Sequence, residues 1–362
     1  NKKSKQKIIM ENQTFNDIIV DTQYGDCGKG KIVKYLADLN NYQYCVKPIG
    51  GANAGHTIYH NGIKHVGHQV PSVMVKNAYL QKDENPIICV IGPNCYVDLE
   101  KLDKELTSLE NLTKSNLRKY MKIAYNAHVT LPKHIEDDKA NDMSGSTHCG
   151  IRPTARDKYD RCGKRVIDFA DKNGKVFGCD IVNTFELLND LENPTRGVLF
   201  EGSQGFWLDI NWGKYPFITS SDCTSASVSS CGMPLSRISR IWGVAKIYET
   251  YVGANSFQPE DDEDLKRIQI VGEEFGATTG RPRQCNWLNL DKLRQAIIMN
   301  DITQLVFNKC DIIEKIGVFK LYHNQTLIQF SNLLEMKDYI NQKIEKFKEN
   351  IEIIYSYSKE TL

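Results

Sequence analysis

The stretch DIIVDTQYGDCGKGKIVKYLADL, residues 17–39, decides the fold, because an apolar run passes through a glycine-bearing turn into a segment of helical period. Ile18–Val20 predicts a buried strand and Lys31–Leu39 predicts a helix. A turn in this position can hold an anion, since backbone N–H groups and the helix dipole favour negative charge at a helix N-terminus. The turn is not a Walker loop, which would need glycine at position 23 and a hydroxyl at position 30, where the chain has Gln23 and Gly30.

The turn nevertheless offers the groups that bind a nucleotide phosphate with magnesium. Lys29 supplies a cation beside the glycine amides. The missing hydroxyl removes the usual magnesium ligand, and Asp26, which we expect to be buried in the turn, can replace it because magnesium accepts carboxylates together with phosphates. The alternative is a glycine turn without a ligand. The predicted phosphate loop consists of Gly25, Asp26, Cys27, Gly28, Lys29, Gly30 and Lys31.

Short β-branched runs alternate with longer segments of helical period along the rest of the chain. This alternation predicts an α/β fold with a large, mainly parallel central sheet flanked by helices. After a flexible leader at residues 1–15, we expect residues 16–362 to form a single catalytic domain. Further strands are predicted at 44–48, 87–91, 198–201, 241–247 and 305–308, and further helices at 99–117, 290–299 and 333–350.

Composition limits the class of ligand and the compartment. The 46 Lys and Arg residues nearly cancel the 45 Asp and Glu residues, so no overall charge attracts nucleic acid or an anionic membrane, and a small ligand is expected. The 11 cysteines form no CxxC pair, which favours reduced thiols. No apolar stretch reaches the roughly 18 residues of a membrane span. We therefore expect a cytoplasmic protein, in the host cytoplasm if the source is viral.

The tetrapeptide NKCD, residues 308–311, follows another apolar run. NKxD is a guanine-reading pattern, because a carboxylate such as Asp311 accepts two parallel hydrogen bonds from the ring NH and the exocyclic amine of guanine. Alone, the motif is also compatible with an ordinary turn at the end of a strand. Together with the phosphate loop it favours GTP, with Lys309 and Asp311 at the base and with ATP left open.

Three polar loops add candidate ligands. GGANAGHTI, residues 50–58, is expected to be a loop in which His56 can serve as an acid beside a phosphate. Gln204 and Thr219 lie in the polar segments EGSQG and YPFITSS. The loop GATTGRPR, residues 276–283, is rich in donors that suit a carboxylate, because arginine forks match carboxylate oxygens in pairs. Two anionic partners are therefore implied.

These residues carry a family resemblance. The chain resembles adenylosuccinate synthetases, and the similarity extends from about residue 17 to residue 311. It implies the P-loop-NTPase-like fold of that family, and the short chain is similar to the compact archaeal and phage members. The supporting blocks, in the order of the family, are QYGDCGKGKIV, GGANAGHT, HQVPS, STHCGIRPTARDKYDR, VLFEGSQG, YPFITSS, VGANSFQPE, GEEFGATTGRPR and NKCD.

The resemblance implies a ligase reaction in two stages. GTP first phosphorylates the 6-oxygen of a purine nucleoside monophosphate, and the amine of L-aspartate then displaces that phosphate. By matched motif position, Asp26 is the base, His56 the acid, and Gln204 stabilises the phosphorylated intermediate. Mg²⁺ is expected on Asp26 and on the carbonyl of Gly55.

The same matching implies three binding sets and a homodimer. Arg161 is expected to reach the nucleotide phosphate of a neighbouring subunit. The GTP set comprises Gly25, Asp26, Cys27, Gly28, Lys29, Gly30, Lys31, Gly55, His56, Thr57, Lys309 and Asp311; the purine nucleotide set comprises Asn53, Thr147, Arg161, Gln204, Thr219, Val252 and Arg281; the aspartate set comprises Thr278, Thr279, Arg281 and Arg283.

Departures from the family pattern bear on the substrate. Asp21 replaces the usual glycine, as in phage relatives that act on dGMP, whereas Asp26 is retained where many of those relatives have serine. The retained base favours IMP, with dGMP as the alternative. Tyr251 stands in place of an arginine, and the C-terminal IIYSYSKETL lacks the family's glycine-proline turn. Two further alternatives, an inactive GTP-dependent binding protein and a GTPase switch, are disfavoured because the catalytic and aspartate-binding motifs are present.

Overall fold

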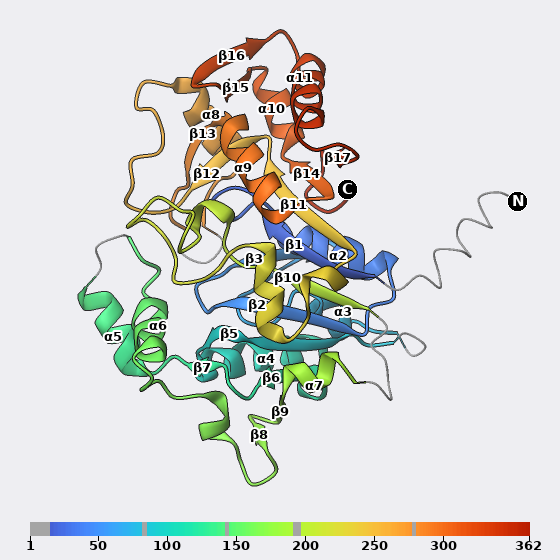
Figure 1. The fold of residues 1–362 in the computed structure, drawn as a ribbon, viewed down its shortest axis with the longest axis vertical. Coiled ribbons are helices and arrows are strands. Elements are labelled where there is room, and N and C mark those ends of the chain that lie inside the picture. Colours follow the sequence, from blue (N-terminus) through green and yellow to red (C-terminus); the bar gives the residue numbers. More distant parts are fainter. Residues whose placement is uncertain (1–14, 82–84, 142–144, 191–196, 277–279) are drawn as a thin grey trace, which may run out of the picture.

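The computed structural model describes residues 15–81, 85–141, 145–190, 197–276 and 280–362, which are built around one large sheet (Figure 1). Neighbouring strands of this sheet are parallel except for the antiparallel pair β8–β9, so the predicted fold class is confirmed. The order across the sheet is β17 (Glu352–Tyr355), β14 (Gln304–Asn308), β11 (Arg240–Lys246), β1 (Asn16–Asp21), β10 (Val198–Glu201), β2 (Tyr44–Gly51), β5 (Ile88–Val97), β6 (Met121–Ala124), β9 (Cys179–Val182) and β8 (Lys175–Val176), with β7 (His128–Val129) beside β5.

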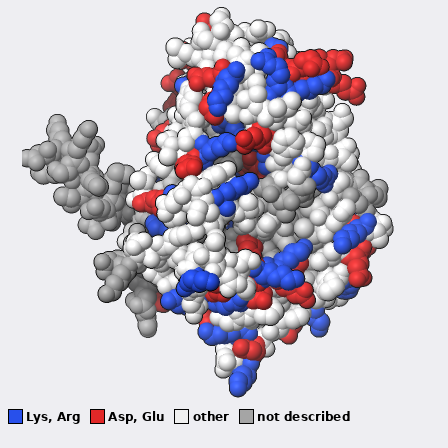
Figure 2. Space-filling view, turned by 180° about the vertical axis from the view of Figure 1, so that it is seen from behind, with Lys and Arg blue, Asp and Glu red and all other residues white. Residues whose placement is uncertain are grey.

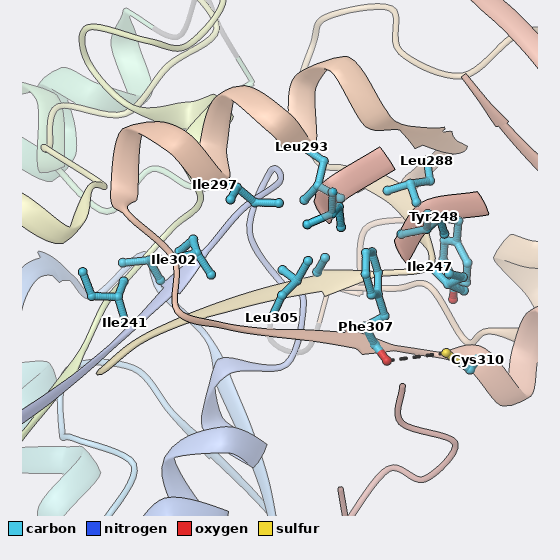
Figure 3. Close-up of a cluster of buried hydrophobic side chains, with 14 of the residues drawn as sticks. Ile241, Ile247, Tyr248, Leu288, Leu293, Ile297, Ile302, Leu305, Phe307 and Cys310 are labelled. Atoms are coloured by element: carbon cyan, nitrogen blue, oxygen red, sulfur yellow. Dashed lines mark hydrogen bonds between the residues drawn. The ribbon is translucent and has the colours of Figure 1, made fainter. Parts of the chain in front are cut away.

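Helices cover both faces of the sheet, which explains why its strands are apolar on both sides. Successive residues of β1 point to opposite faces: Ile18 packs in one hydrophobic cluster and Ile19 in the other. The Ile18 cluster includes residues of α8 (Glu263–Val271), α9 (Leu290–Asn300), α10 (Cys310–Ile316) and α11 (Leu333–Glu345), and part of it is drawn in Figure 3. The Ile19 cluster includes residues of α2 (Lys29–Leu39), α3 (Met74–Ala78) and α4 (Leu99–Thr113).

Smaller elements surround this core. A four-stranded sheet of β12 (Tyr248–Tyr251), β13 (Gln284–Asn289), β15 (Phe319–His323) and β16 (Thr326–Phe330) lies with α8 and α11 at the top of Figure 1. The short helices α5 (Pro132–Ala140), α6 (Ile151–Tyr159) and α7 (Thr184–Leu188) lie toward the other end. Positive and negative side chains are mixed over the face in Figure 2, in keeping with the formal net charge of +1.

One predicted loop is partly a hairpin. His56 and Thr57 do not lie in a loop but begin β3 (His56–His60), which pairs with β4 (Ile63–Gly67). The turn between the strands consists of Asn61 and Gly62, whose φ angles are 50° and 77°. Asn-Gly is the preferred sequence for a two-residue turn with two positive φ angles, so the signal was present in the sequence.

Several predicted boundaries are wrong by a few residues. The helix predicted at 99–117 ends at Thr113, because Lys114 has a left-handed backbone with φ of 56°. The helix predicted to Asn350 ends at Glu345, and α2 begins at Lys29, two residues before the predicted start. Most of the predicted leader lies outside the described residues. No helix in the described part of the chain is long and apolar enough to cross a membrane.

Candidate functional site

The candidate site lies where five parallel strands of the central sheet end. In open parallel sheets, ligands bind in the crevice outside the carboxyl ends of the strands. The turn of the phosphate loop follows β1, and the other polar side chains come from the ends of neighbouring strands or directly after them. These are His56 after β2, Gln204 after β10, Lys246 at the end of β11, and Asn308 and Lys309 at the end of β14.

The phosphate loop has the backbone that its glycines predicted. Gly25, Asp26 and Gly28 have φ angles of 86°, 58° and 100°, a region that glycine enters without strain. A Cβ atom on Gly28 would lie 2.8 Å from the side-chain nitrogen of Asn308, so this position also needs glycine for space. Helix α2 begins directly after the turn, at Lys29. Its first N–H groups therefore face the region where a phosphate is expected.

Asp21 organises this turn from inside the protein. Its buried carboxylate accepts hydrogen bonds from the backbone N–H groups of Gln23, Gly25 and Cys27, at 3.0, 3.2 and 3.0 Å. It also accepts from Lys29 Nζ at 3.2 Å, and the same amine donates to the carbonyl of Gln204 at 2.6 Å. The loop is thus held by an internal carboxylate.

Asp26 is not buried as expected, since 36% of its side chain is exposed. Its carboxylate accepts a hydrogen bond from Arg283 Nε at 2.8 Å. Burial of the surrounding loop opposes ionisation, but the positive charges of Arg283, Lys246 and Lys29 outweigh it and hold the pKa of Asp26 below its usual value. Asp26 is therefore an accessible carboxylate that is ionised at neutral pH.

A second carboxylate, Glu274, lies behind Arg283 and was missed by the sequence reasoning. Glu274 accepts hydrogen bonds from Arg283 Nη1 at 2.8 Å, Lys246 Nζ at 2.7 Å and the Tyr248 hydroxyl at 2.7 Å, and Lys309 Nζ lies 3.7 Å away. Burial alone would raise the pKa of Glu274, but the three cations lower it to about 2. Glu274 lies within the quoted block GEEFGATTGRPR, which was the available signal.

His56 is oriented by a carboxylate that was also missed. His56 Nδ1 makes a short hydrogen bond to Glu201, whose carboxylate also accepts from the backbone N–H of Ser72 at 2.7 Å and from its hydroxyl at 2.5 Å. Burial and the charge of Lys47 lower the pKa of His56, although Glu201 acts in the opposite direction. The imidazole of the ligand-free protein is therefore neutral at pH 7.

Two cavities meet at these residues. The first, of about 200 Å³, extends along the phosphate loop to Asn308, Lys309 and Asp311. The second, of about 140 Å³, is lined by residues that include Gly25, Asn53, Thr147, Gln204 and Val252. Four residues line both cavities and so mark the junction: Asp26, Lys29, Gly55 and His56.

Some residues that line the two cavities carry buried polar atoms without partners. Asn53 Oδ1 and Gln204 Nε2, an acceptor and a donor in the second cavity, are buried without a hydrogen-bond partner among the described residues. Asn308 Oδ1, in the first cavity, is in the same state. Because an unsatisfied buried polar group costs about 1–3 kcal/mol, these three residues are candidates for hydrogen bonds to a ligand.

The remaining predicted residues are placed as follows. Cys27, Gly28, Gly30, Lys31 and Thr57 line the first cavity with the rest of the GTP set, whereas Gly25 lines only the second. Arg281 donates to the carbonyls of Gly145 and Ser146 beside the second cavity, and Thr219 bonds through its backbone to Leu208 of the cavity wall. Arg283 lines the first cavity, and Arg161 is exposed in the turn after α6, away from both cavities. Thr278 and Thr279 lie outside the described residues.

The C-terminal segment closes the far end of the first cavity. Ser358 and Lys359 contribute to its wall beside Asp311. Lys31 holds this segment by donating to the Ser356 hydroxyl at 2.7 Å and to the Ser358 carbonyl at 3.0 Å. Burial lowers the pKa of Lys31 to about 8. The departure from the family's glycine-proline turn therefore still produces an ordered wall.

Comparison with known proteins gives a consistent result. The family model of adenylosuccinate synthetase matches residues 18–178 and 173–359. The adenylosuccinate synthetase of Borrelia turicatae is 31% identical over 94% of this chain and 86% of its own length. That of Geobacillus kaustophilus is 35% identical over 88% of this chain and 84% of its own length.

Solved structures share the fold at lower identity. A fully ligated adenylosuccinate synthetase from Plasmodium falciparum superposes with a TM-score of 0.79 at 23% identity, covering 95% of this chain and 97% of that one. The succinoaminodeoxyadenylate synthetase of cyanophage S-2L, bound to dGMP and dATP, superposes with a TM-score of 0.72, also at 23% identity, covering 96% and 94%. The structural similarity to each of these two proteins therefore extends over nearly the whole chain.

Proposed function

Because this chain belongs to the adenylosuccinate synthetase family and is therefore a ligase of that type, we propose that it joins L-aspartate to the 6-oxo position of IMP, with GTP as the phosphoryl donor. The observation that carries this proposal is the junction between the two cavities. Phosphoryl transfer needs the donor phosphate and the accepting oxygen to be in line and in contact. Two cavities that meet at Asp26, Lys29, Gly55 and His56 provide such a contact.

The residues at the junction suit the two required proton movements. Asp26, ionised and exposed to both cavities, removes the proton from the ring nitrogen next to the 6-oxygen, which makes that oxygen nucleophilic. His56 donates a proton or hydrogen bond to the transferring phosphoryl group. The phosphate charge raises the pKa of the imidazole when GTP binds, and Glu201 stabilises the cation that results.

Gln204 lies on the purine side of the junction. Gln204 and Asn53 both line the second cavity, and each has one buried side-chain atom without a partner among the described residues: the donor Nε2 of Gln204 and the acceptor Oδ1 of Asn53. A purine with an oxo group and a ring NH offers one acceptor and one donor, which complements this pair. We assign Gln204 to the phosphorylated 6-oxygen, and Asn53, Thr147, Thr219, Val252 and Arg281 to the nucleotide.

A magnesium ion fits the junction. Asp26 offers an exposed carboxylate there, and Gly55 lines the same wall, so a cation bound to phosphate oxygens would find a hard oxygen ligand. Bound there, Mg²⁺ would neutralise charge on the phosphates. Arg283, which now pairs with Asp26, also lines this cavity, so we assign it to the phosphate side and leave Arg281, Thr278 and Thr279 for aspartate.

The far end of the first cavity favours guanine over adenine. Asp311 lines that end beside Lys309. A carboxylate accepts the paired hydrogen bonds of guanine, whereas adenine presents a ring acceptor at the same position and would be repelled. We therefore propose GTP as the donor and ATP as a poor substitute.

We further propose a cytoplasmic homodimer in which the exposed Arg161 reaches the partner's nucleotide.

The test is aspartate-dependent product formation with GTP and Mg²⁺, with IMP and dGMP assayed side by side and the better substrate repeated with ATP. We expect turnover with IMP, because the retained Asp26 suits a 2-unsubstituted purine. Preferential turnover with dGMP would show that the substrate is dGMP, as in the phage enzymes, and not IMP. GTP hydrolysis without aspartate or purine nucleotide would contradict the ligase assignment.

A further inference from the structure

We propose that Glu274 is a positioning residue of the phosphate site, which anchors one edge of the Arg283 guanidinium while the other edge transfers from Asp26 to a bound phosphate. This inference rests on the proposed function of the junction. Arg283 contacts the two carboxylates through different nitrogens: Nε donates to Asp26 and Nη1 donates to Glu274, both at 2.8 Å. Because the guanidinium has five N–H donors in a rigid plane, one contact can open while the other stays.

The two carboxylates differ in their freedom to move. Glu274 is fully buried and is fixed by Lys246 and by the Tyr248 hydroxyl, each at 2.7 Å. Tyr248 belongs to the hydrophobic cluster in Figure 3, and Lys246 is itself held by the Thr250 hydroxyl at 2.9 Å. Asp26, by contrast, is 36% exposed on a glycine-bearing turn. The contact that opens is therefore the one to Asp26.

The opening of that contact has a chemical purpose. A carboxylate that is bound by a guanidinium is a weak base, and it presents fewer oxygens to a cation. A triphosphate entering the first cavity offers Arg283 a more highly charged partner. Asp26 can then act as a base on the purine, while Glu274 keeps Arg283 in place beside the bound phosphate.

Removing the charge of Glu274 should therefore leave Arg283 fixed mainly to Asp26. In Glu274→Gln we expect kcat to fall about tenfold and the KM for GTP to rise, whereas the KM for IMP should change by less than about twofold, because Arg283, through which Glu274 acts, lines the first cavity and not the second. Glu274→Asp keeps the charge and should retain more of kcat than Glu274→Gln. A rise in the KM for IMP as large as the rise in the KM for GTP would overturn the proposal.

A double-mutant cycle tests whether Glu274 acts through Arg283. In an Arg283→Leu background, Glu274→Gln should cause no further loss of kcat/KM for GTP. If the two losses instead multiply, Glu274 acts independently and the inference is wrong. Calorimetric binding of GTP to the same four proteins gives a second readout, which remains valid even if the wild-type protein forms no product and the proposed function fails.

The chain offers a matched control. Glu110 also accepts a hydrogen bond from an arginine, Arg118 Nε at 3.1 Å, but on α4 and outside both cavities. Glu110→Gln should lower the melting temperature without changing either KM. If Glu110→Gln changes the KM for GTP as much as Glu274→Gln does, the effect reflects general destabilisation and the positioning role is excluded.

Discussion

The two cavities that meet at the junction hold their polar groups in different ways. Along the phosphate loop, buried charges are paired within the protein: Lys29 with Asp21, and Arg283 and Lys246 with Glu274. In the second cavity, where we place the purine, two neutral amide atoms lack partners among the described residues, Asn53 Oδ1 and Gln204 Nε2, whereas the first cavity has one, Asn308 Oδ1. A buried charge without a counter-ion costs several kcal/mol, whereas an unpaired amide costs about 1–3 kcal/mol.

This difference has a consequence for the roles of individual residues. On the proposed phosphate side, ion pairs contribute to the stability of the protein, and bound GTP would compete for some of them. On the proposed purine side, the unpaired amide atoms contribute little to stability, and we expect them to find hydrogen-bond partners when the purine nucleotide binds. Substitutions on the phosphate side should therefore lower the free energy of unfolding, whereas substitutions on the purine side should lower activity alone.

The largest effect is expected where the two sides join. Asp26→Asn should lower kcat by about 10³-fold, because the amide cannot act as a base and general base catalysis contributes on the order of 10²–10⁴-fold. The fold should remain intact, since Asn has nearly the same shape and Arg283 keeps its bond to Glu274. Steady-state assays with IMP measure this, and a loss below tenfold would remove Asp26 from its role as the base.

The next effect tests the charged side. Asp21→Asn should lower the free energy of unfolding by about 3 kcal/mol, because Lys29 loses its counter-ion while it stays buried. Urea unfolding at pH 7 measures this change. An unchanged midpoint would mean that the pairing of charges on this side does not stabilise the protein, and the comparison would fail.

Acid should weaken the same side. Because the pKa of Glu274 is lowered to about 2 by Lys246, Lys309 and Arg283 against the effect of burial, its contribution is complete above the unfolded pKa, near 4.3, and is lost as the pH falls toward 2. The full contribution is about 3 kcal/mol. Urea unfolding between pH 6 and pH 3 should give a steeper loss for the wild type than for Glu274→Gln. If the free energy of unfolding falls equally with pH in both proteins, Glu274 does not make this contribution.

The neutral side should behave in the opposite way. Gln204→Asn shortens the amide by one methylene and tolerates the φ of 59° at this position. We expect kcat to fall by about tenfold to a hundredfold, because a misplaced donor no longer reaches the 6-oxygen, while the free energy of unfolding changes by less than about 1 kcal/mol. A destabilisation as large as that of Asp21→Asn would show that the two sides do not differ.

The smallest effect calibrates the others. Lys359 and Glu273 form an ion pair at 2.7 Å, but both side chains are exposed. Lys359→Ala should change the free energy of unfolding by less than about 0.5 kcal/mol, as is typical of exposed pairs. The urea midpoint measures this, and a change of 2 kcal/mol would mean that exposed pairs matter as much here as buried ones.

Local signals predicted the core strands and the phosphate loop well. β10 has the predicted limits, Val198–Glu201, because a short run with three apolar residues between polar turns is typical of a buried strand in a parallel sheet. The predicted lengths of β2 and β5 were too short. Their pairing continues past Pro48 and Gly92 through a register shift that the sequence of neither strand indicates. Residues such as Pro and Gly normally end a strand.

The missed site residues share a different cause. Glu201 and Glu274 are carboxylates whose partners lie far away in sequence: Glu201 meets His56 across 145 positions, and Glu274 meets Lys246 across 28. A sequence indicates which residues can ionise, but not which cation will lie beside them after folding. Asp26 was wrongly expected to be buried for the same reason, since exposure depends on how the cavities open.

The carboxylate of Asp21 also bears on how fast nucleotide can bind. It already occupies the loop amides of Gln23, Gly25 and Cys27, much as a phosphate oxygen would. The protein therefore holds the turn in one shape by itself, so the conformational entropy of ordering it is lost during folding and not during binding. Association should then be a docking to a rigid loop, with a rate set by diffusion and electrostatic attraction, and not by a slow rearrangement of the loop.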